Sequence, residues 1–391
     1  MAKTYPRDKE NHQINKLPIR TVFCEDESIS SWMIRAALNQ GCDPLTFTQY
    51  YWARHRLWTL DLDKGFDHFD PTINIDVSKL AETDVEKIVN FHTFSLMYKQ
   101  MKYGEDFYKK NTSWIIPLAK RNRVRFIGYQ YCPICFNDES TEPYLRIYWR
   151  FTWNIFCTVH KVLLQNKCPS CGDVYQPQLL DATSRHINHC YYCKSDLFLD
   201  NYQQAIDHFY KDRALNFQLR AHNVYLNGSG RLLGQELQFK DWFDTVLFFL
   251  NIIRKGKENP DYMFGLLLNE FNIPLKAIQH SIEPLSINFL SAVTRCELFS
   301  TLELMMIITK EEWIVALLKY NVTQNSFHWS KNSVIPKGFY PVYQNLPELA
   351  KLQVASRASC GVKSKKTIAK EWTALEKQFK RMGFYEKCKS T

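Results

Sequence analysis

The chain has 391 residues, of which 45% are hydrophobic and 15% aromatic, and its formal net charge at pH 7 is +10. A chain of this length can form two or three domains with cores of their own, and its apolar content excludes a disordered polymer. We expect neither a signal peptide nor a transmembrane helix, because no apolar run is long enough to span a bilayer.

The positive charge is concentrated at the C-terminal end. Residues 351–391 contain 11 Lys and Arg against 3 Asp and Glu, a balance of +8, which leaves only +2 for the rest of the chain. A basic terminal segment is typical of proteins that bind nucleic acid or another polyanion, although a solvated terminus is the plainer alternative.

In chain order, residues 1–17 are polar and expected to be flexible, and residues 18–125 are expected to form a helical N-terminal domain. Two helices are predicted on either side of Gly41, and Asp43 is a suitable N-cap for the second. The acidic residues at 24–28 favour the positive end of the first helix dipole. The pair resembles a helix-turn-helix unit and equally any αα-hairpin.

Two polar stretches complete this domain. Residues 61–77 are expected to be a connector, and residues 120–125 are a short basic run. The run is able to contact phosphates, or to form the exposed edge of a strand that enters the next segment. Its candidate binding residues are Lys120, Arg121 and Arg123.

Residues 126–200 hold the strongest chemical signal, four pairs of metal-ligand residues with two residues inside each pair. The pairs are Cys132 and Cys135, Cys157 and His160, Cys168 and Cys171, and Cys190 and Cys193. Such a turn places two ligands on one side of a tight loop, and two turns complete a tetrahedron around zinc. The sequence therefore predicts a tandem zinc ribbon with two Zn²⁺ ions.

Spacing alone does not decide which pairs combine around each metal ion. Neighbouring pairs can combine in sequence, or the first can join the third and the second the fourth. Either way each set has four protein ligands, so structural zincs are expected rather than catalytic ones. His186 and His189 lie just before the last pair and could replace a ligand, although ordinary histidines are the plainer interpretation. The five scattered cysteines outside the pairs indicate reduced thiols in a cytoplasm.

Residues 201–308 are expected to form a helical domain. Aromatic residues recur with helical spacing over 242–250 and are expected to belong to the core. Gly256 and Pro260 are expected to interrupt the helices, and a longer apolar helix is predicted over 284–308.

Residues 309–391 are expected to contain a second helix-turn-helix unit and a basic helix. Thr309 and Glu312 form a capping box, Asn321 lies in a turn, and a second helix is predicted over 323–329. As a recognition helix it would read bases or phosphates, and it is equally suited to docking a protein. Its candidate residues are Gln324, Asn325, Ser326, His328 and Lys331.

The basic helix is predicted over 366–381. Its apolar face needs a partner in this chain or in another one. That face consists of Ile368, Trp372, Leu375 and Phe379. The candidate residues for nucleic-acid or partner contact in front of it are Lys363, Lys365 and Lys366.

Three of these features, in this order, resemble the TniQ family of transposon target-selection proteins. The first is the opening Asp26-Glu-Ser-Ile-Ser-Ser-Trp-Met-Ile-Arg-Ala36, which is similar to the family's own opening. The second is Tyr131-Cys-Pro-Ile-Cys135, followed by Trp149, Trp153 and the Cys157 and His160 pair. The third is the last two cysteine pairs. The resemblance covers about residues 18–200.

The resemblance implies a non-enzymatic prokaryotic protein. Its length is near that of the shorter members, which ride on a type I-F CRISPR Cascade. For those the resemblance implies a head-to-tail homodimer at the Cas6/Cas7 end of the guide-RNA complex, where it recruits the AAA+ regulator TnsC for RNA-guided DNA transposition. Their helix-turn-helix serves protein contacts. The alternative is a TnsD-like, sequence-specific DNA-binding protein that marks a fixed attachment site.

Overall fold

The computed structural model of the protein describes the following residues: 16–52, 57–65, 70–93, 95–97, 113–118, 127–138, 140–198, 208–273, 286–329, 334–348, 369, 372 and 373. Most of the secondary structure in these residues is helical, and two strands among them form a sheet. The expected fold class, a mostly α chain with a central cysteine-rich segment, is confirmed. The predictions for the basic run and for most of the C-terminal basic helix concern residues outside this set. The same holds for the predicted flexible N-terminus, residues 1–17, except residues 16 and 17, of which Leu17 is buried.

The first two helices form where the sequence predicts them. The helix α1 (Ile29–Asn39) is capped by the Ser28 side chain, and the turn that follows it contains Gly41 with a φ of +69°. The helix α2 (Pro44–Trp52) begins directly after Asp43, whose carboxylate accepts the amide of the first turn over 2.8 Å. Almost every residue of α1 is buried, so this helix is the centre of the N-terminal core.

The stretch expected to be a polar connector contains the start of a third helix. The helix α3 (Thr72–Ala81) overlaps the second part of residues 61–77. Its residues Ile73, Val77 and Leu80 recur at spacings of four and three, and all three are buried. The connector prediction is therefore wrong there, because a short apolar stripe was hidden among polar neighbours.

Four α-helices of the described chain lie between residues 208 and 306. They are α7 (His208–Asn227), α8 (Phe239–Glu258), α9 (Met263–Glu270) and α10 (Ala292–Met306). α7 packs along α10, and α8 packs against α9. Gly256 does not interrupt α8, contrary to expectation. A Cβ at this position would lie 2.5 Å from Leu268 Cδ1, so the glycine permits the close approach of α9.

The apolar helix predicted over 284–308 is shorter than expected. It begins only at Ala292, because the Ser291 side chain accepts the amide of Thr294 over 3.1 Å and so caps the helix there. A separate 3-10 turn, Ile287–Phe289, lies before the cap.

A β-hairpin that the sequence analysis did not predict joins α7 to α8. Its strands are β1 (Ser229–Leu232) and β2 (Gln235–Gln238), paired antiparallel. The two residues between them, Leu233 and Gly234, both have positive φ, as the favoured two-residue hairpin turns require.

The second predicted helix-turn-helix forms only in its first half. The helix α11 (Lys310–Lys319) begins at the expected capping box, in which Thr309 and Glu312 exchange both hydrogen bonds. Over 323–329, however, the structure has a single 3-10 turn, Gln324–Phe327, in place of a second helix. The prediction of a recognition helix is wrong over these residues.

Contacts with other parts of the chain hold this 3-10 turn in place. The backbone amide of Gln324 donates to Pro347 O over 3.1 Å, and its side-chain amide donates to Leu346 O over 3.1 Å. These bonds bind the start of the expected helix to residues that precede the C-terminal segment. Phe327 and Trp329 also both pack against Phe248, with ring centroids 5.5 Å and 5.3 Å away, whereas two residues with this spacing point to opposite sides of a helix.

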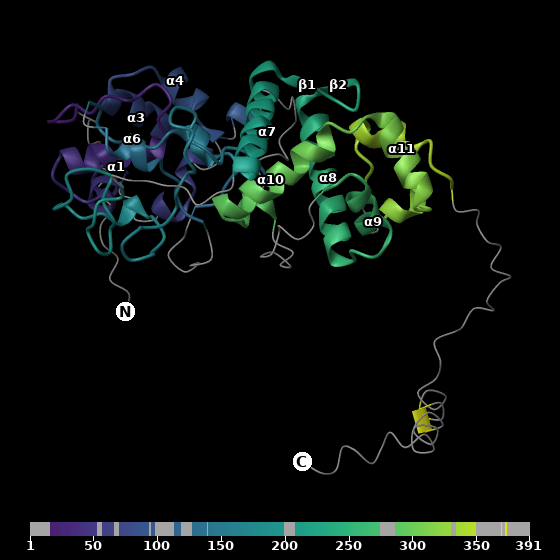
Figure 1. Ribbon diagram of the computed structural model, residues 1–391. Helices are drawn as coiled ribbons and strands as arrows, with labels where there is room; N and C mark the ends of the chain where they lie inside the picture. The colour runs from purple at the N-terminus through teal and green to yellow at the C-terminus, as the bar shows by residue number, and fades with distance from the viewer. Residues whose placement is uncertain are drawn as a thin grey trace, which may run out of the picture.

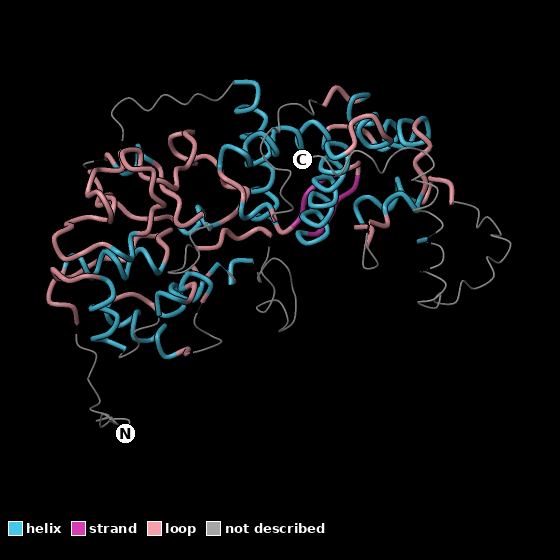
Figure 2. Tube along the Cα trace, turned by 90° about the horizontal axis from the view of Figure 1, so that it is seen from below, coloured by secondary structure: helices cyan, strands magenta, loops and turns pink. Residues whose placement is uncertain are grey.

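The shorter elements are α4 (Val85–Asn90), α6 (Pro133–Phe136) and α12 (Tyr340–Tyr343). The helices α1, α3, α4 and α6 lie at one end of the molecule, α9 and α11 lie at the other end, and α7 and α10 lie between them (Figure 1). Loops gather in the half that holds the cysteine-rich segment (residues 126–200), as Figure 2 shows. Among the described helices, none has the length and hydropathy needed to cross a bilayer.

Buried apolar residues form three clusters, centred on the N-terminal helices, the cysteine-rich segment and the C-terminal helices. The third cluster reaches into the cysteine-rich segment. Phe151 stacks on Trp153 with centroids 4.5 Å apart, and Trp153 packs against Phe243 of α8 at 4.9 Å. The cysteine-rich segment is therefore packed against helices on both sides.

Candidate metal centre

The first ligand set joins the first two pairs. Cys132, Cys135, Cys157 and His160 bring their ligand atoms within 4.8 Å of one another. His160 Nδ1 lies 3.5 Å, 3.3 Å and 3.8 Å from the sulfur atoms of these three cysteines, taken in chain order. A tetrahedral zinc ion, about 2.3 Å from sulfur and about 2.0 Å from nitrogen, holds its ligand atoms roughly 3.5–3.8 Å apart. The set fits such an ion.

The second set joins the last two pairs. Cys168 Sγ lies 3.6 Å from Cys193 Sγ, and Cys171 Sγ lies 3.7 Å from Cys190 Sγ. The four sulfur atoms form one cluster, as in the first set. The sequential combination is therefore the one that the structure adopts, and the interleaved alternative is not. The second set is more open, because Cys171 is exposed.

Three of the four pairs lie in the same kind of turn. In each, the residue directly after the second ligand donates its amide to the carbonyl of the first ligand and has a positive φ. The donors are Lys161 (2.9 Å, +55°), Gly172 (2.9 Å, +76°) and Lys194 (3.0 Å, +63°). Only Gly172 signals this conformation in the sequence, because glycine accepts a positive φ without strain.

The first pair is arranged differently. Cys132 caps the short helix α6, and the amide of Cys135 points at Cys132 Sγ over 3.4 Å. The thiols of Cys132 and Cys157 raise the pKa of Cys135, since they hydrogen-bond to it in its protonated form. Four deprotonated ligands at these distances need a cation between them, so metal binding and local folding are coupled.

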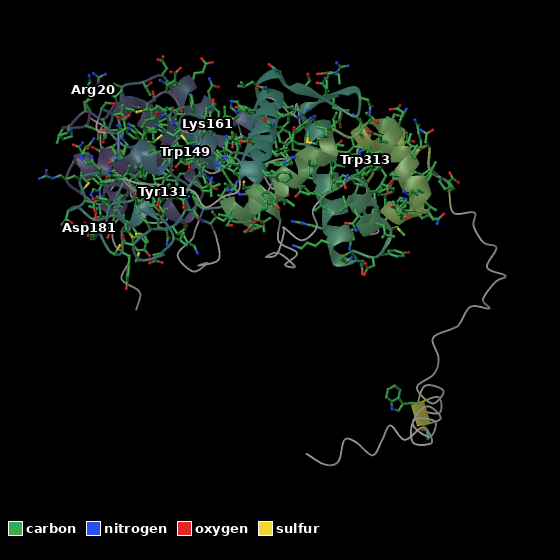
Figure 3. The ribbon with its side chains drawn as sticks, in the orientation of Figure 1. Arg20, Tyr131, Trp149, Lys161, Asp181 and Trp313 are labelled. Atoms are coloured by element: carbon green, nitrogen blue, oxygen red, sulfur yellow. The ribbon has the colours of Figure 1, made fainter. Side chains whose placement is uncertain are left out.

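Three packed aromatic rings connect the two ligand sets. Tyr131 stacks on Phe136 with ring centroids 5.0 Å apart and meets Tyr175 edge-on at 5.1 Å. The Tyr131 hydroxyl donates to Lys167 O over 2.7 Å, just before the second set, and the Tyr175 hydroxyl donates to Ile187 O over 2.6 Å. In Figure 3, Tyr131, Trp149 and Lys161 are labelled in the same half of the molecule. The two sets therefore share one core.

Buried ion pairs attach the N-terminal helices to the cysteine-rich segment. Arg35 of α1 donates to Glu27 over 2.6 Å and to Glu142 over 2.5 Å. Burial raises the pKa of Glu27, and the charge of Arg35 opposes that rise. Nearby, Asp26 pairs with Arg146. The acidic residues at 24–28 thus hold long-range ion pairs, a role that the helix-dipole interpretation missed.

A second buried pair strengthens the same contact. Arg150 donates to Asp61 over 2.7 Å and to Asp63 over 2.6 Å, and all three side chains are nearly excluded from solvent. Asp63 in turn accepts the backbone amide of Ser30, at the start of α1, over 2.9 Å. An arginine within an apolar stretch, such as Arg150 between Trp149 and Phe151, is the sequence signal that could have indicated a buried pair.

Gln218 of α7 attaches the C-terminal helices. Its side-chain oxygen accepts the amides of Ile155 (3.0 Å) and Phe156 (2.9 Å), and its side-chain nitrogen donates to Phe156 O over 2.9 Å. These three bonds satisfy backbone groups of the cysteine-rich segment that are buried and would otherwise lack partners.

Arg295 of α10 makes a second attachment. Its side chain is completely buried and donates to the carbonyl of Thr152 and to the side-chain oxygen of Gln130. Burial lowers the pKa of Arg295 to about 9, because carbonyl groups solvate its charge less well than water does. With Gln218, this arginine fixes α7 and α10 to the cysteine-rich segment.

The two histidines before the last pair are not part of either set. His189 lies 3.0 Å from Asp196 through Nε2 and 3.2 Å from the His186 carbonyl through Nδ1, so both of its ring nitrogens have partners. His186 is exposed. The plainer interpretation of these residues is confirmed.

The candidate binding residues of the C-terminal half differ in whether their side chains are free to contact a partner. Asn325 and His328 are exposed, whereas Gln324 is tied to the returning chain and Ser326 is bonded to Thr323. Lys331 lies outside the described residues. So do the remaining candidates Lys120, Arg121, Arg123, Lys363, Lys365 and Lys366. The structure therefore brings the eight metal ligands together and does not assemble one nucleic-acid surface from the other candidates that it describes.

Comparison with known families identifies the N-terminal part. Residues 18–164 match the family model of TniQ. The chain carries a TniQ-family domain. The resemblance seen in the sequence is thereby confirmed over residues 18–164, whereas the last two cysteine pairs lie beyond the matched range. The domain associates the chain with target selection in transposition. A search of curated proteins finds no match.

The TniQ domain explains the opening motif of the sequence. Glu27, Ser31 and Arg35 form one buried network, in which Ser31 Oγ donates to Glu27 over 2.7 Å. The matched range also contains the whole first ligand set, whereas the second set follows it. The TniQ domain therefore includes the first metal centre, and the second centre belongs to the same hydrophobic cluster.

Proposed function

We propose that this chain is a non-enzymatic adaptor of transposition. It binds a CRISPR Cascade with its guide RNA at the Cas6/Cas7 end as a homodimer and recruits the AAA+ regulator TnsC. Two structural Zn²⁺ ions hold its cysteine-rich segment. The TniQ domain supports the target-selection part of this proposal.

The observation that carries the adaptor proposal is the way the cysteine-rich segment joins two helical units. Arg35 and Arg150 fix the N-terminal helices to one side, and Gln218 and Arg295 fix the C-terminal helices to the other. A rigid joint between two separate surfaces suits a protein that must hold two partners at a defined distance. Flexible tethering would not keep such a geometry.

The ligand chemistry favours structural zinc. Each set offers four ligands from thiolates and imidazole, which are the donors that zinc prefers, and leaves no coordination position for a catalytic water. Free thiols outside the two sets, such as Cys24, Cys42 and Cys296, fit a reducing cytoplasm.

Direct reading of an attachment site, the TnsD-like alternative, is less well supported. It needs a recognition helix in the major groove, whereas residues 324–327 form a single 3-10 turn. Of the described candidates there, Asn325 and His328 remain exposed. The basic segment 351–391 is the feature that keeps this alternative testable.

The test is an affinity purification of the tagged chain from cells that express the neighbouring Cascade and TnsC genes. The proposal expects guide-length RNA and Cas proteins in stoichiometric amount. A preparation without them, which instead shifts one DNA sequence at physiological salt, would establish the direct reader.

A variant separates the two outcomes further. Replacing Asn325 and His328 by Ala would abolish sequence-specific DNA binding by a direct reader, because base contacts would be lost. An adaptor would have no such binding to lose. Gln344→Ala is a matched control, since Gln344 is an exposed amide that is not among the candidate residues.

A further inference from the structure

The helix α11 presents an apolar face that nothing in the described residues covers. Val315 is 67% exposed and Leu318 is 45% exposed, whereas Trp313 and Leu317 on the other side are buried in the core. Glu311 lies one turn before Val315, so the three exposed residues share one side of the helix. This acidic and apolar strip is called the α11 face below.

The C-terminal segment offers a matching surface. Trp372 is 66% exposed and lies in helical conformation, and Thr373 Oγ1 donates to Ala369 O over 2.8 Å, as in a helical turn. The sequence around it places the apolar residues Ile368, Leu375 and Phe379 at helical spacing with Trp372. An amphipathic helix with so large an exposed indole is stabilised only when that face is buried.

The charges of the two surfaces are opposite. Residues 258–348 contain nine Asp and Glu against six Lys and Arg, a balance of −3. Residues 366–381 contain five Lys and Arg against two Glu, a balance of +3. In the first turn of α11, Glu311 on the α11 face and its neighbour Glu312 are both exposed. Complementary charge steers association and fixes its register.

The chain leaves the described body beside this face. Pro347 accepts the amide of Gln324, in the turn directly after α11, and α12 packs against α11. Figure 1 shows the described chain ending next to α11, at the end of the molecule away from α1. The 17 residues between 348 and 366 can span roughly 60 Å when extended. The segment 366–381 therefore reaches the α11 face of its own chain without strain.

We propose that the segment 366–381 docks as an amphipathic helix on the α11 face of the same chain. Trp372 packs against Val315 and Leu318, and basic side chains of the segment meet Glu311 and Glu312. Docking would place the basic C-terminal residues along the end of the C-terminal helical unit. It would thereby fix where that positive charge is displayed to a partner.

Amine cross-linking of the full chain, followed by mass spectrometry, tests this arrangement. The expected result is a set of cross-links from Lys370 and Lys377 to Lys310 and Lys319 of α11. The protein is prepared as an equal mixture of ¹⁴N- and ¹⁵N-labelled chains, so that links within one chain and links between two copies have different masses.

The decisive variant carries Val315→Asp and Leu318→Asp. Both positions are exposed, so the fold is retained, and metal content and circular dichroism check this. The cross-links should fall about tenfold, because carboxylates in an apolar contact are strongly unfavourable. Val293→Asp, on the exposed side of α10, is the matched control and should leave them unchanged.

Three results would overturn the proposal. The absence of links between the segment and α11 would show that the segment does not dock there. Links that persist in the double variant would show that the apolar contact does not hold it. Links of mixed isotope mass alone would assign the α11 face to a second copy instead of the same chain.

Discussion

Arg35 donates to the Glu27 carboxylate over 2.6 Å, and both side chains are almost completely withdrawn from solvent. The same guanidinium reaches Glu142, 107 residues further along the chain. One arginine inside α1 therefore connects the start of the TniQ domain to the cysteine-rich segment. This relationship explains why an arginine stands within an otherwise apolar helix.

Arg35→Met should destabilise the protein by about 3–5 kcal/mol, because it leaves the Glu27 carboxylate buried without its cation. Chemical denaturation measures this loss as a change in the free energy of unfolding. Arg20→Ala is the control: Arg20 is 63% exposed in its pair with Glu82, and its loss should cost less than about 1 kcal/mol. Equal losses in the two variants would contradict the role of burial.

Much of the N-terminal fold could be predicted because its signals are local. The apolar spacing of α1, the turn at Gly41 and the cap at Asp43 each depend on a few adjacent residues. The pair of Asp26 and Arg146 joins residues 120 positions apart, and no local pattern announces it. The same limit applies to α3, whose apolar stripe is short and surrounded by polar residues.

The metal ligands were also predictable, but their combination was not. Spacing allows either arrangement of pairs, and the choice depends on tertiary contacts. Tyr131 bridges to Gln165, which brings the first pair beside the turn of the second. The expected helix at 323–329 is absent for a similar reason, since Phe327 and Trp329 both pack against Phe248 of α8, which two residues of this spacing could not do from one helix. Neither contact can be read from the segment itself.

Removal of one ligand should remove one metal ion. Cys132→Ser and Cys168→Ser should each lower the zinc content from two ions to one, as metal analysis of the purified protein measures. Each should also lower stability by several kcal/mol, because binding energy in such sites is folding energy. Cys42→Ser, outside both sets, is the control. Unchanged zinc in either ligand variant would contradict the assignment.

The two centres should differ in how fast they lose metal. Each set contains two buried cysteines, but Cys171 of the second set is exposed, whereas its counterpart Cys135 in the first set is half-buried. A chelator should therefore extract about one equivalent of zinc quickly and the other slowly. A chromogenic zinc indicator follows both phases. The fast phase should disappear in Cys168→Ser and persist in Cys132→Ser, and the opposite assignment would contradict the exposure argument.

Gln218→Leu should weaken the attachment of α7 to the cysteine-rich segment. It leaves the amides of Ile155 and Phe156 buried without acceptors, which should lower the free energy of unfolding by about 2–5 kcal/mol for the two amides together. Denaturation measures the total, and hydrogen exchange should show faster exchange at these two amides. Asn216→Leu, on the exposed side of the same helix, should change stability by less than about 0.5 kcal/mol. Unaltered exchange in Gln218→Leu would contradict the proposed attachment.

His222 of α7 should make stability depend on pH. Burial lowers the pKa of His222 from its ordinary value of 6.5. Below pH 6.5 the unfolded chain binds a proton at His222 more tightly than the folded protein does. The neutral, buried His222 therefore contributes its full stability above pH 6.5, and this stability is lost as the pH falls below 6.5. The ring also lies edge-on to Tyr148, with centroids 5.8 Å apart, so charging it disturbs a packed aromatic contact.

The measurement compares denaturation of the native chain and of His222→Phe between pH 8 and pH 5, about the range over which a histidine with a lowered pKa titrates. Other groups, the metal ligands included, titrate in both proteins, so the difference between the two unfolding free energies isolates His222. That difference should be constant above pH 6.5 and should shift in favour of the variant below it. Parallel profiles for His222→Phe and the native chain would show that His222 does not titrate between the folded and unfolded states.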